Sequence, residues 1–550
     1  MKNTFFIATS THKAPEEVMA LVPPVPLGNE ENASGGRRSS GAAGPAAIAV
    51  GGDLADEEHA LHHVAARWID LDASPLLVST GAGQRRRYHG NSTATHLIPI
   101  PFTCGNETSP HPPKCSATPS PPSPPKAVPT SGEPSPPSCP DYFRYIHDDL
   151  RPWRDAGITR ETVERARPHA FFRLVIVAGR AYVETYRRAF QTRDVFTQWG
   201  ILQLLRRYPG RVPDLDLMFA CDDPGQVRAA DFLPEMSKAP PVFRYCKDAS
   251  TLDVVFPDWS FWGWPEVGIG PWKQMLEEVK EENERVKWPE RQPYAFWKGN
   301  PMSYPMRVEL MRCNVSNGQE WNARVFTQKY IMACDSPVLF VRTPFQDILS
   351  RGLVAGEHYW PISRDHMCKS IKFAVDWGNE HPAQARLIGE QGSRFVREEM
   401  SMDYVYDYML HLLTEYAKLL RYKPTVPEKA VEVCTESMAC TARGLHRDCM
   451  MDSMERHVAG FQPCTLPAPF TDEEAKKIAD REAEMLRKAA ASPSSAMPRA
   501  CTSEPGLWDW ACMTPWKLER HLPPPLTKDK AKGIAHREAE MLRNVENMEG

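Results

Sequence analysis

The sequence predicts an α/β fold, because strand, loop and helix signals follow one another repeatedly in its central part. Residues 217–221 are an apolar run, and residues 252–264 begin with a second such run that leads into an aromatic loop. A helix is expected over 272–288, and residues 294–307 open a third unit with another apolar run and a Lys-Gly-Asn turn. Strands that alternate with helices in this way form a mainly parallel sheet covered by helices.

Composition limits the organisation and the partners. A chain of 550 residues is too long for one core, and its 52 prolines indicate that part of it forms no core. The net charge of −4 gives no basic excess, so we expect neither nucleic acid nor an anionic membrane surface as partner. No apolar run approaches the ~18 residues of a membrane helix, and the one in residues 1–10 is too short for a signal peptide. Asn91, Asn106 and Asn314 begin glycosylation sequons that would act in a lumen.

The first segment, residues 1–138, is rich in Gly, Ala, Ser and Pro and is predicted to be a disordered stalk. Order is expected from Cys139 onward, where an α/β domain over 139–290 begins. In it, Thr159 precedes a short helix as its cap, and residues 171–183 are a branched, apolar stretch suited to paired strands.

A second α/β domain is predicted over 291–424 by a strand at 337–341 and by three later stretches with helical periodicity, at 370–377, 383–390 and 403–420. Pro424 ends the compact part.

The last segment, residues 425–550, contains a charged helix at 478–487 that recurs at 534–543, and we interpret it as a duplicated tail. Its cysteines fit no zinc spacing and are predicted to form local disulfides: Cys434, Cys440, Cys449, Cys464, Cys501 and Cys512.

Asp222 and Asp223 are the leading catalytic candidates. They follow the strand at 217–221, and ligands of α/β sheets bind at the carboxyl ends of strands. A carboxylate there can accept the proton of an attacking hydroxyl. The alternative is that both residues only begin the turn at Pro224-Gly225.

Two further groups have a functional and a structural interpretation. Asp214-Leu-Asp216 matches a pattern that holds Mn²⁺ beside a nucleotide diphosphate, but it lies at the wrong end of its strand, so no metal site is expected. Four aromatic residues after the second strand can stack on a sugar or a peptide, or can belong to the core: Trp259, Phe261, Trp262 and Trp264.

The Lys298-Gly299-Asn300 turn is a candidate site for an anionic leaving group. Gly299 lets the backbone approach a ligand closely, and an arginine such as Arg307 can hold a diphosphate through two parallel hydrogen bonds. The alternative is a turn with no role beyond its left-handed residue.

Eight motifs, taken in chain order, resemble those of glycosyltransferase family 90, the Rumi-like protein O-glucosyltransferases, and chiefly its plant members. They cover about 139–465 and are Cys139-Pro-Asp-Tyr-Phe, Phe190-Gln-Thr-Arg-Asp, Pro213-Asp-Leu-Asp-Leu, Phe256-Pro-Asp-Trp-Ser-Phe-Trp-Gly-Trp, Phe296-Trp-Lys-Gly-Asn, Ala333-Cys-Asp-Ser336, His358-Tyr-Trp-Pro-Ile and Gly392-Ser-Arg-Phe-Val.

The resemblance implies a GT-B fold, in which two Rossmann-like domains face a cleft. It implies inverting, metal-independent transfer of glucose or xylose from a UDP-sugar to a protein or glycan hydroxyl, with no cofactor, in the lumen of the endoplasmic reticulum or Golgi. Membrane anchoring is expected of the family. By position, Asp223 matches the general base. The donor would contact Lys298, Gly299, Asn300, Arg307 and Ser336, and the substrates would contact Asp222, Asp258, Trp259 and Trp262.

This chain departs from the family pattern in the signal anchor that we do not find, in its repeated tail and, with the largest consequence, at one internal place. Between Gln328 and Lys329, relatives carry a further stretch with a strand and a small-residue loop that contacts the nucleotide diphosphate, whereas here its two flanks are fused. We therefore expect an impaired transferase, and the alternative is an inactive glycan- or protein-binding remnant of the same fold.

Overall fold

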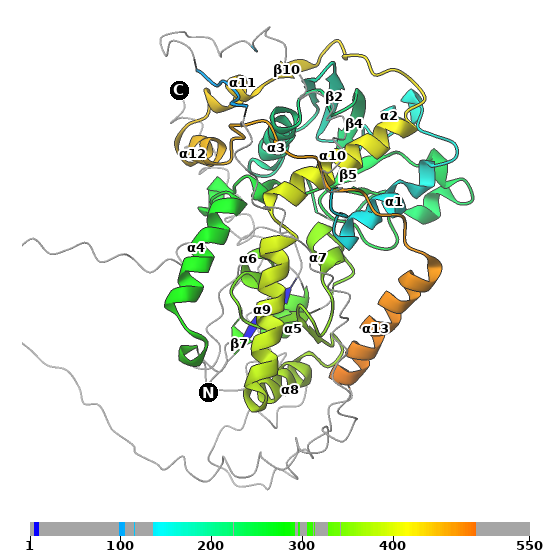
Figure 1. The fold of residues 1–550 in the computed structure, drawn as a ribbon. Helices are drawn as coiled ribbons and strands as arrows, with labels where there is room; N and C mark the ends of the chain where they lie inside the picture. Colours follow the sequence, from blue (N-terminus) through cyan, green and yellow to red (C-terminus); the bar gives the residue numbers. More distant parts are fainter. Residues whose placement is uncertain are drawn as a thin grey trace, which may run out of the picture. The chain divides into compact units, whose positions relative to one another are not determined.

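The protein is described by a computed structural model that covers residues 5–9, 98–104, 115, 136–223, 225–291, 295–296, 305–311, 313, 328–341 and 343–490. These residues belong to one compact unit, 1–492, and residues 493–550 form a second unit that lies outside the described part. The described part combines two β-sheets with helices, so the predicted α/β class is confirmed (Figure 1).

The larger sheet has six strands in the order β10-β3-β2-β4-β5-β6. Strand β2 pairs antiparallel with both β3 and β4, and β4, β5 and β6 run parallel to one another. The carboxyl ends of these three parallel strands therefore meet at one edge of the sheet. The bounds of the six strands are β2 (Phe172–Val177), β3 (Arg180–Thr185), β4 (Leu215–Phe219), β5 (Val242–Arg244), β6 (Val254–Val255) and β10 (Val431–Val433).

Helices accompany this sheet for reasons visible in the sequence. Thr159 caps α2 as predicted, because its hydroxyl oxygen accepts a hydrogen bond from the Thr162 N–H at 3.2 Å. Helix α10 (Met402–Leu419) buries its apolar face, and its Tyr416 hydroxyl donates to the carbonyl of Asp216 at 2.9 Å. The helices between the first described residues and β7 are α1 (Tyr145–Leu150), α2 (Arg160–Glu164), α3 (Arg193–Arg207) and α4 (Trp272–Arg285).

The smaller sheet has four parallel strands in the order β7-β1-β8-β9. Its strands are β1 (Phe5–Thr9), β7 (Ala295–Phe296), β8 (Val338–Val341) and β9 (Trp360–Ile362). In Figure 1 the dark-blue β1, from the start of the chain, lies among the green elements of the middle of the chain. For these five residues the prediction of a disordered stalk is wrong, because an apolar segment distant in sequence pairs with β7 and β8.

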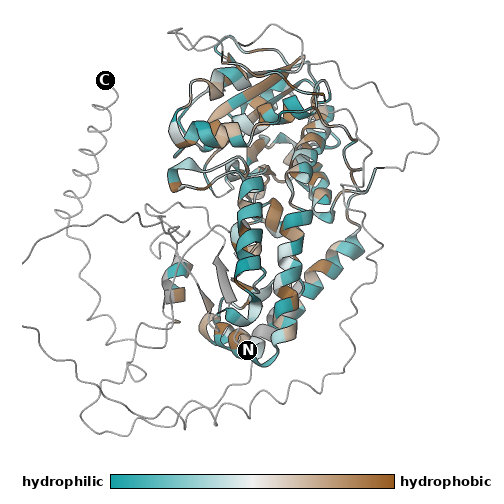
Figure 2. Cartoon of the chain, turned by 60° about the vertical axis from the view of Figure 1, so that its left-hand side comes forward, coloured by the Kyte–Doolittle hydropathy of each residue, from teal (hydrophilic) through white to brown (hydrophobic). Residues whose placement is uncertain are grey.

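Two hydrophobic clusters lie on the two sides of β8, because side chains alternate along a strand. Val338 and Phe340 belong to the large cluster that also contains the six-stranded sheet, whereas Leu339 and Val341 belong to a smaller cluster with α5 and α8. Figure 2 shows teal and brown residues alternating along the helices, which is typical of helices that bury one face. The helices of the second half are α5 (Pro305–Met311), α6 (Gln328–Met332), α7 (Ile348–Gly352), α8 (Met367–Glu380), α9 (Pro382–Glu398) and α10 (Met402–Leu419).

The tail contributes α11 (Thr435–Ala439), α12 (Gly444–Asp452) and α13 (Asp472–Ala490). Helix α13 contains the first copy of the charged repeat, and the second copy lies outside the described residues. Within the described ranges, no helix combines the length and the apolar character needed to cross a membrane.

The prediction of local disulfides in the tail is wrong. Three tail cysteines pair across 319 to 336 residues of sequence, as Cys104–Cys440, Cys115–Cys434 and Cys139–Cys464, and Cys449 is buried as a free thiol. A fourth disulfide joins Cys313 to Cys368, whereas Cys501 and Cys512 lie outside the described residues. The predicted stalk is thus fastened to the tail at two cysteines, since the folded unit brings both ends of the compact part together.

Candidate active site

The candidate site is built at the edge where the parallel strands of the six-stranded sheet end. Asp222 and Asp223 follow β4, and the Ala220 N–H still pairs with the Phe243 carbonyl at 2.9 Å. Asp258 and Trp259 follow β6 at the same edge, because β4, β5 and β6 are parallel. The structure therefore brings together two pairs of predicted site residues that are 36 positions apart in sequence.

Asp223 is held by a buried cation. The Arg193 Nη1 lies 3.0 Å from Asp223 Oδ1, and the two side chains are 4% and 14% exposed. The Arg193 guanidinium also lies over the Trp259 ring, 4.4 Å from its centre. An adjacent cation favours the charged form of a carboxylate, and packing on the ring fixes where that cation sits. Asp223 is thus held in a defined position beside a cation, with part of its surface open to solvent.

Asp222 belongs to a second ionic group, next to the Arg193–Asp223 pair. Arg244, which is fully buried at the end of β5, donates from Nη1 to Asp222 and from Nε to Asp253 Oδ1 at 2.9 Å. Asp253 in turn accepts from the backbone N–H groups of Gln226 and Val227 at 3.0 and 3.2 Å. These bonds tie the loop that carries Asp222 and Asp223 to the ends of two other strands.

Gly225 allows that loop to close. A Cβ at this position would lie 2.3 Å from Thr251 Oγ1 and 3.0 Å from Asp253 Oδ2. A side chain there would displace Thr251 and Asp253 or move the loop, so this close approach favours glycine.

The aromatic loop is part of the core, which corrects the prediction that Trp259 and Trp262 stack on a substrate. Trp259 and Trp262 are 1% and 0% exposed, and Phe261 and Trp264 are also buried. The Trp262 Nε1–H donates to the Tyr406 hydroxyl at 3.0 Å. Large rings on the inner side of a sheet edge are covered by the helices, and Trp259 contacts the site through Arg193.

Asp258 begins the short 3-10 helix at this loop as its cap. Its carboxylate accepts hydrogen bonds from the Ser260 N–H, at 2.9 Å, and from the Ser260 hydroxyl. Any contact between Asp258 and a substrate stays a prediction.

Asp214 and Asp216 have structural partners. The buried Asp216 receives two bonds from Arg173, from Nε at 2.7 Å and Nη2 at 2.6 Å, and one from the Tyr422 hydroxyl at 2.8 Å. Asp214 accepts from the Ala178 N–H at 2.7 Å. Both carboxylates are therefore engaged at the end of β4 that is opposite to Asp223.

The predicted donor-binding residues belong to the four-stranded sheet. Arg307 lies in α5 and is 4% exposed, and burial lowers the pKa of its guanidinium. The buried Ser336 hydroxyl accepts from Arg291 Nη1 at 2.6 Å, within a turn that Asn283 and Ser393 also hold. Lys298, Gly299 and Asn300 lie outside the described residues. Donor contacts of all five residues stay predictions.

A groove of about 910 Å³ lies elsewhere, between α4, α9 and the segment around Cys139. Its lining is largely charged and includes Arg291, Asp335 and Arg397, but neither Asp223 nor Arg307. The groove is therefore separate from the strand edge that carries Asp223.

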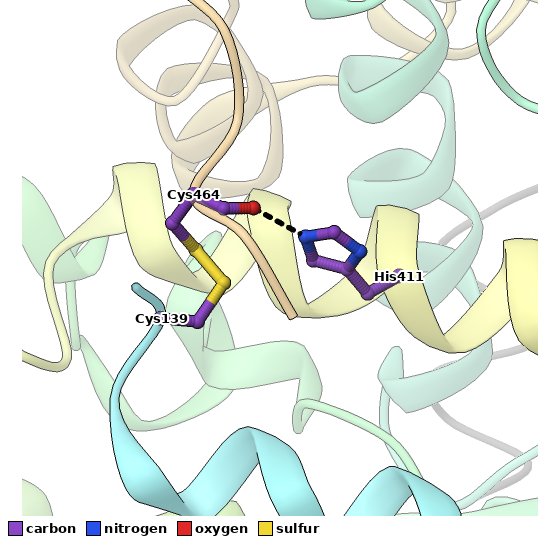
Figure 3. A group of neighbouring side chains, drawn as sticks. All are labelled: Cys139, His411 and Cys464. Atoms are coloured by element: carbon purple, nitrogen blue, oxygen red, sulfur yellow. Dashed lines mark hydrogen bonds between the residues drawn. A yellow bond between two sulfur atoms is a disulfide. The ribbon is translucent and has the colours of Figure 1, made fainter. Parts of the chain in front are cut away.

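One cluster of metal-binding residue types, Cys139, His411 and Cys464, is structural. Figure 3 shows the two sulfur atoms joined as a disulfide and the His411 ring bonded to the Cys464 carbonyl, from Nε2 at 2.8 Å. Sulfur atoms that are bonded to each other offer no thiolate to a metal ion.

Reasoning from the sequence missed Arg193, Arg244 and Asp253, the residues that fix the two aspartates. Arg193 begins α3 and belongs to the motif at 190–194, Arg244 ends the apolar strand β5, and Asp253 directly precedes the apolar strand β6. A buried charge requires a partner of opposite charge. Charged residues beside apolar segments were therefore a signal from which ion pairs with the two aspartates could have been predicted.

Known proteins match this chain across its central part. The family model for glycosyl transferase family 90 matches residues 134–329 and 325–492, which together cover more than half of the chain. The two matched segments overlap at residues 325–329. This overlap includes the 328/329 junction, where the family resemblance implies a missing stretch.

Three curated relatives are similar at low identity. An O-glucosyltransferase rumi homolog of Aedes aegypti is 24% identical over 54% of this chain and 82% of its own length. Protein O-glucosyltransferase 1 of Homo sapiens is 25% identical over 52% of this chain and 82% of its own length. O-glucosyltransferase rumi of Drosophila melanogaster is 24% identical over 52% of this chain and 78% of its own length. From the extent of the family match, the chain belongs to glycosyl transferase family 90, a family of sugar-transferring enzymes.

Proposed function

We propose that this glycosyltransferase moves glucose or xylose from a UDP-sugar to a hydroxyl of a protein or glycan, with inversion and without a metal ion. The observation that carries the proposal is the position of Asp223. It is a partly exposed carboxyl group at the carboxyl edge of the sheet, held beside the cation of Arg193 at 3.0 Å. A general base needs this combination of charge, fixed position and access.

In the proposed reaction, the acceptor oxygen attacks the anomeric carbon of the donor while Asp223 takes the hydroxyl proton. The bond between the anomeric carbon and the diphosphate oxygen breaks on the opposite face, so the configuration inverts. Arg307 and the turn at Gly299 would stabilise the negative charge that develops on the departing UDP. No step requires a metal ion, because the arginine supplies the compensating charge.

The lumen of the endoplasmic reticulum or Golgi is the proposed compartment. Four disulfides among the described residues support it, since disulfides persist in oxidising compartments. They include the three that fasten the tail to the segment before the first helix.

Donor turnover by Asp223→Asn tests the assignment of the base. We expect transfer and donor hydrolysis to fall by about 10²-fold or more, measured at a temperature where the variant is still folded, because Asp223→Asn also removes the anion that pairs with the buried Arg193. Asp376→Asn is the matched control, because Asp376 is an exposed aspartate that pairs with Lys372 at 2.8 Å on α8. Equal activity of Asp223→Asn and the parent chain would refute the assignment, and loss of activity in EDTA would refute metal independence.

A non-catalytic binding protein is the second candidate. The division of the family match into two segments at residues 325–329 favours it, because the family resemblance implies that part of the donor site belongs there. Binding of a glycoprotein without turnover of any UDP-sugar would support this second function.

A further inference from the structure

The four-stranded sheet contains one strand from far away in the sequence. Strand β7 is followed by α5, and β8 and β9 follow later, but β1 between β7 and β8 comes from residues 5–9. Phe5 and Phe6 pair with Ala295 and Phe296, and residues 6–9 pair with 338–341. The family resemblance implies that a strand is missing at the fused flanks at 328/329, and β1 occupies a position inside the sheet, between β7 and β8.

Strand β7 depends on β1. In the order β7-β1-β8-β9, β7 pairs with β1 alone, and one side of β8 also pairs with β1. Without β1, β7 and β8 would lie two strand spacings apart, about 9.6 Å, with unpaired backbone groups on both. A strand position of this kind is a binding site for an extended segment.

The Phe-Phe-Ile-Ala-Thr sequence suits this position. Parallel strands covered on both faces are nearly continuous apolar runs with branched and aromatic residues. Leu339 and Val341 of β8 face the smaller hydrophobic cluster and Val338 and Phe340 face the larger one, so both faces of the sheet are covered.

We propose that the chain's own residues 5–9 act as a replacement strand, filling the position between β7 and β8 and holding β7 and α5 on the sheet. The smaller hydrophobic cluster contains Ala295 of β7 and Met306 and Leu310 of α5. Loss of the replacement strand would therefore loosen α5. Only the consequence for donor binding through Arg307 rests on the proposed function.

A cysteine pair in the full chain tests the register. Phe5 and Ala295 are partners in adjacent strands, so Phe5→Cys with Ala295→Cys should form a disulfide within one chain. Ala8→Cys with Ala295→Cys is the control, because Ala8 is three residues further on, about 10 Å away and beyond disulfide reach. We expect at least about tenfold more cross-link from the first pair, detected by peptide mass spectrometry.

Two results would overturn the proposal. Equal or absent cross-linking in both variants would show that residues 5–9 do not occupy this position. A cross-link found only in dimers on a non-reducing gel would show that a second copy of the chain supplies the strand.

Hydrogen exchange tests the dependence of β7 and β8 on the strand. Phe6 pairs with both neighbours, and proline there removes a ladder donor. We expect amide exchange at Leu339 and Val341 to become at least about tenfold faster in Phe6→Pro and to stay unchanged in Val18→Pro, which lies beyond β1. Unchanged exchange in Phe6→Pro would refute the replacement role, whatever the outcome of the transfer assays.

Discussion

Asp149→Asn should destabilise the protein strongly, because Asp149 is the shared anion of a buried ionic cluster. It is 1% exposed and receives two bonds from Arg351, both at 2.8 Å, one from Lys247 at 3.1 Å and one from the Val255 N–H at 3.1 Å. Arg351 belongs to α7, which follows β8. Lys247 lies in the loop after β5, and Val255 belongs to β6 of the six-stranded sheet. The cluster therefore connects elements of both sheets.

The magnitude follows from burial. Burial alone would raise the pKa of Asp149, but the charges of Arg351 and Lys247 outweigh it and hold this pKa below its ordinary value. The asparagine variant leaves two cations, 3% and 13% exposed, without their anion. Breaking a buried pair from one side costs about 3–5 kcal/mol, whereas an exposed pair contributes about 0–1 kcal/mol.

Urea unfolding measures this difference. The control is Asp376→Asn, since the Lys372–Asp376 pair has the same 2.8 Å separation but is 62% and 53% exposed. Asp149→Leu combined with Arg351→Met should recover part of the loss, because one buried cation is removed with the anion.

The dependence on pH gives a second check of the same cluster. The stabilisation by Asp149 is present above the unfolded-state pKa of about 3.9 and is lost as pH falls through the lower folded-state value. The difference in unfolding free energy between the parent chain and Asp149→Asn should therefore disappear below about pH 4. A loss under ~1 kcal/mol at pH 7, or a gap that does not change with pH, would refute the reasoning.

Three further outcomes are expected. Burial lowers the pKa of His411, so the folded state binds its proton less readily than the unfolded state, and stability should fall as pH drops below about 6.5; His411→Gln should flatten that part of the profile of unfolding free energy. Gly225→Ala should reduce transfer by displacing the Asp222–Asp223 loop. Gly270→Ala should leave transfer unchanged, because its nearest contact would be an ordinary 3.6 Å. UDP should bind this chain more weakly, by orders of magnitude in calorimetric titration, than a variant with the family stretch restored at 328/329. Equal affinities would show that the stretch is dispensable.

Local pattern was enough to predict the elements near the site. The helix predicted at 403–420 is observed at Met402–Leu419, and the strand predicted at 217–221 is β4 at Leu215–Phe219. Both depend on apolar periodicity within one segment. Asp222 and Asp223 were predicted for a related reason, since polar residues that follow a buried strand lie at its end.

Partners distant in sequence were not predictable in this way. The disulfide Cys104–Cys440 and the pairing of Phe5–Thr9 with β8 each depend on the folded unit bringing remote segments together. The four aromatic rings of the loop after β6 were ambiguous, because stacking on a ligand and packing in a core require the same residue types. Burial alone decided between those interpretations.

The replacement strand and the missing donor contacts have different consequences for function. A strand taken from residues 5–9 restores backbone hydrogen bonds to β7 and β8, because any extended segment offers the same N–H and carbonyl groups. A nucleotide diphosphate instead needs donors at particular points in space, each worth about 1.5–3 kcal/mol when charge-assisted. Asp223, held by Arg193, belongs to the other sheet and does not depend on β1. This chain can thus keep its fold and Asp223, the proposed base, while its affinity for the proposed UDP-sugar donor falls.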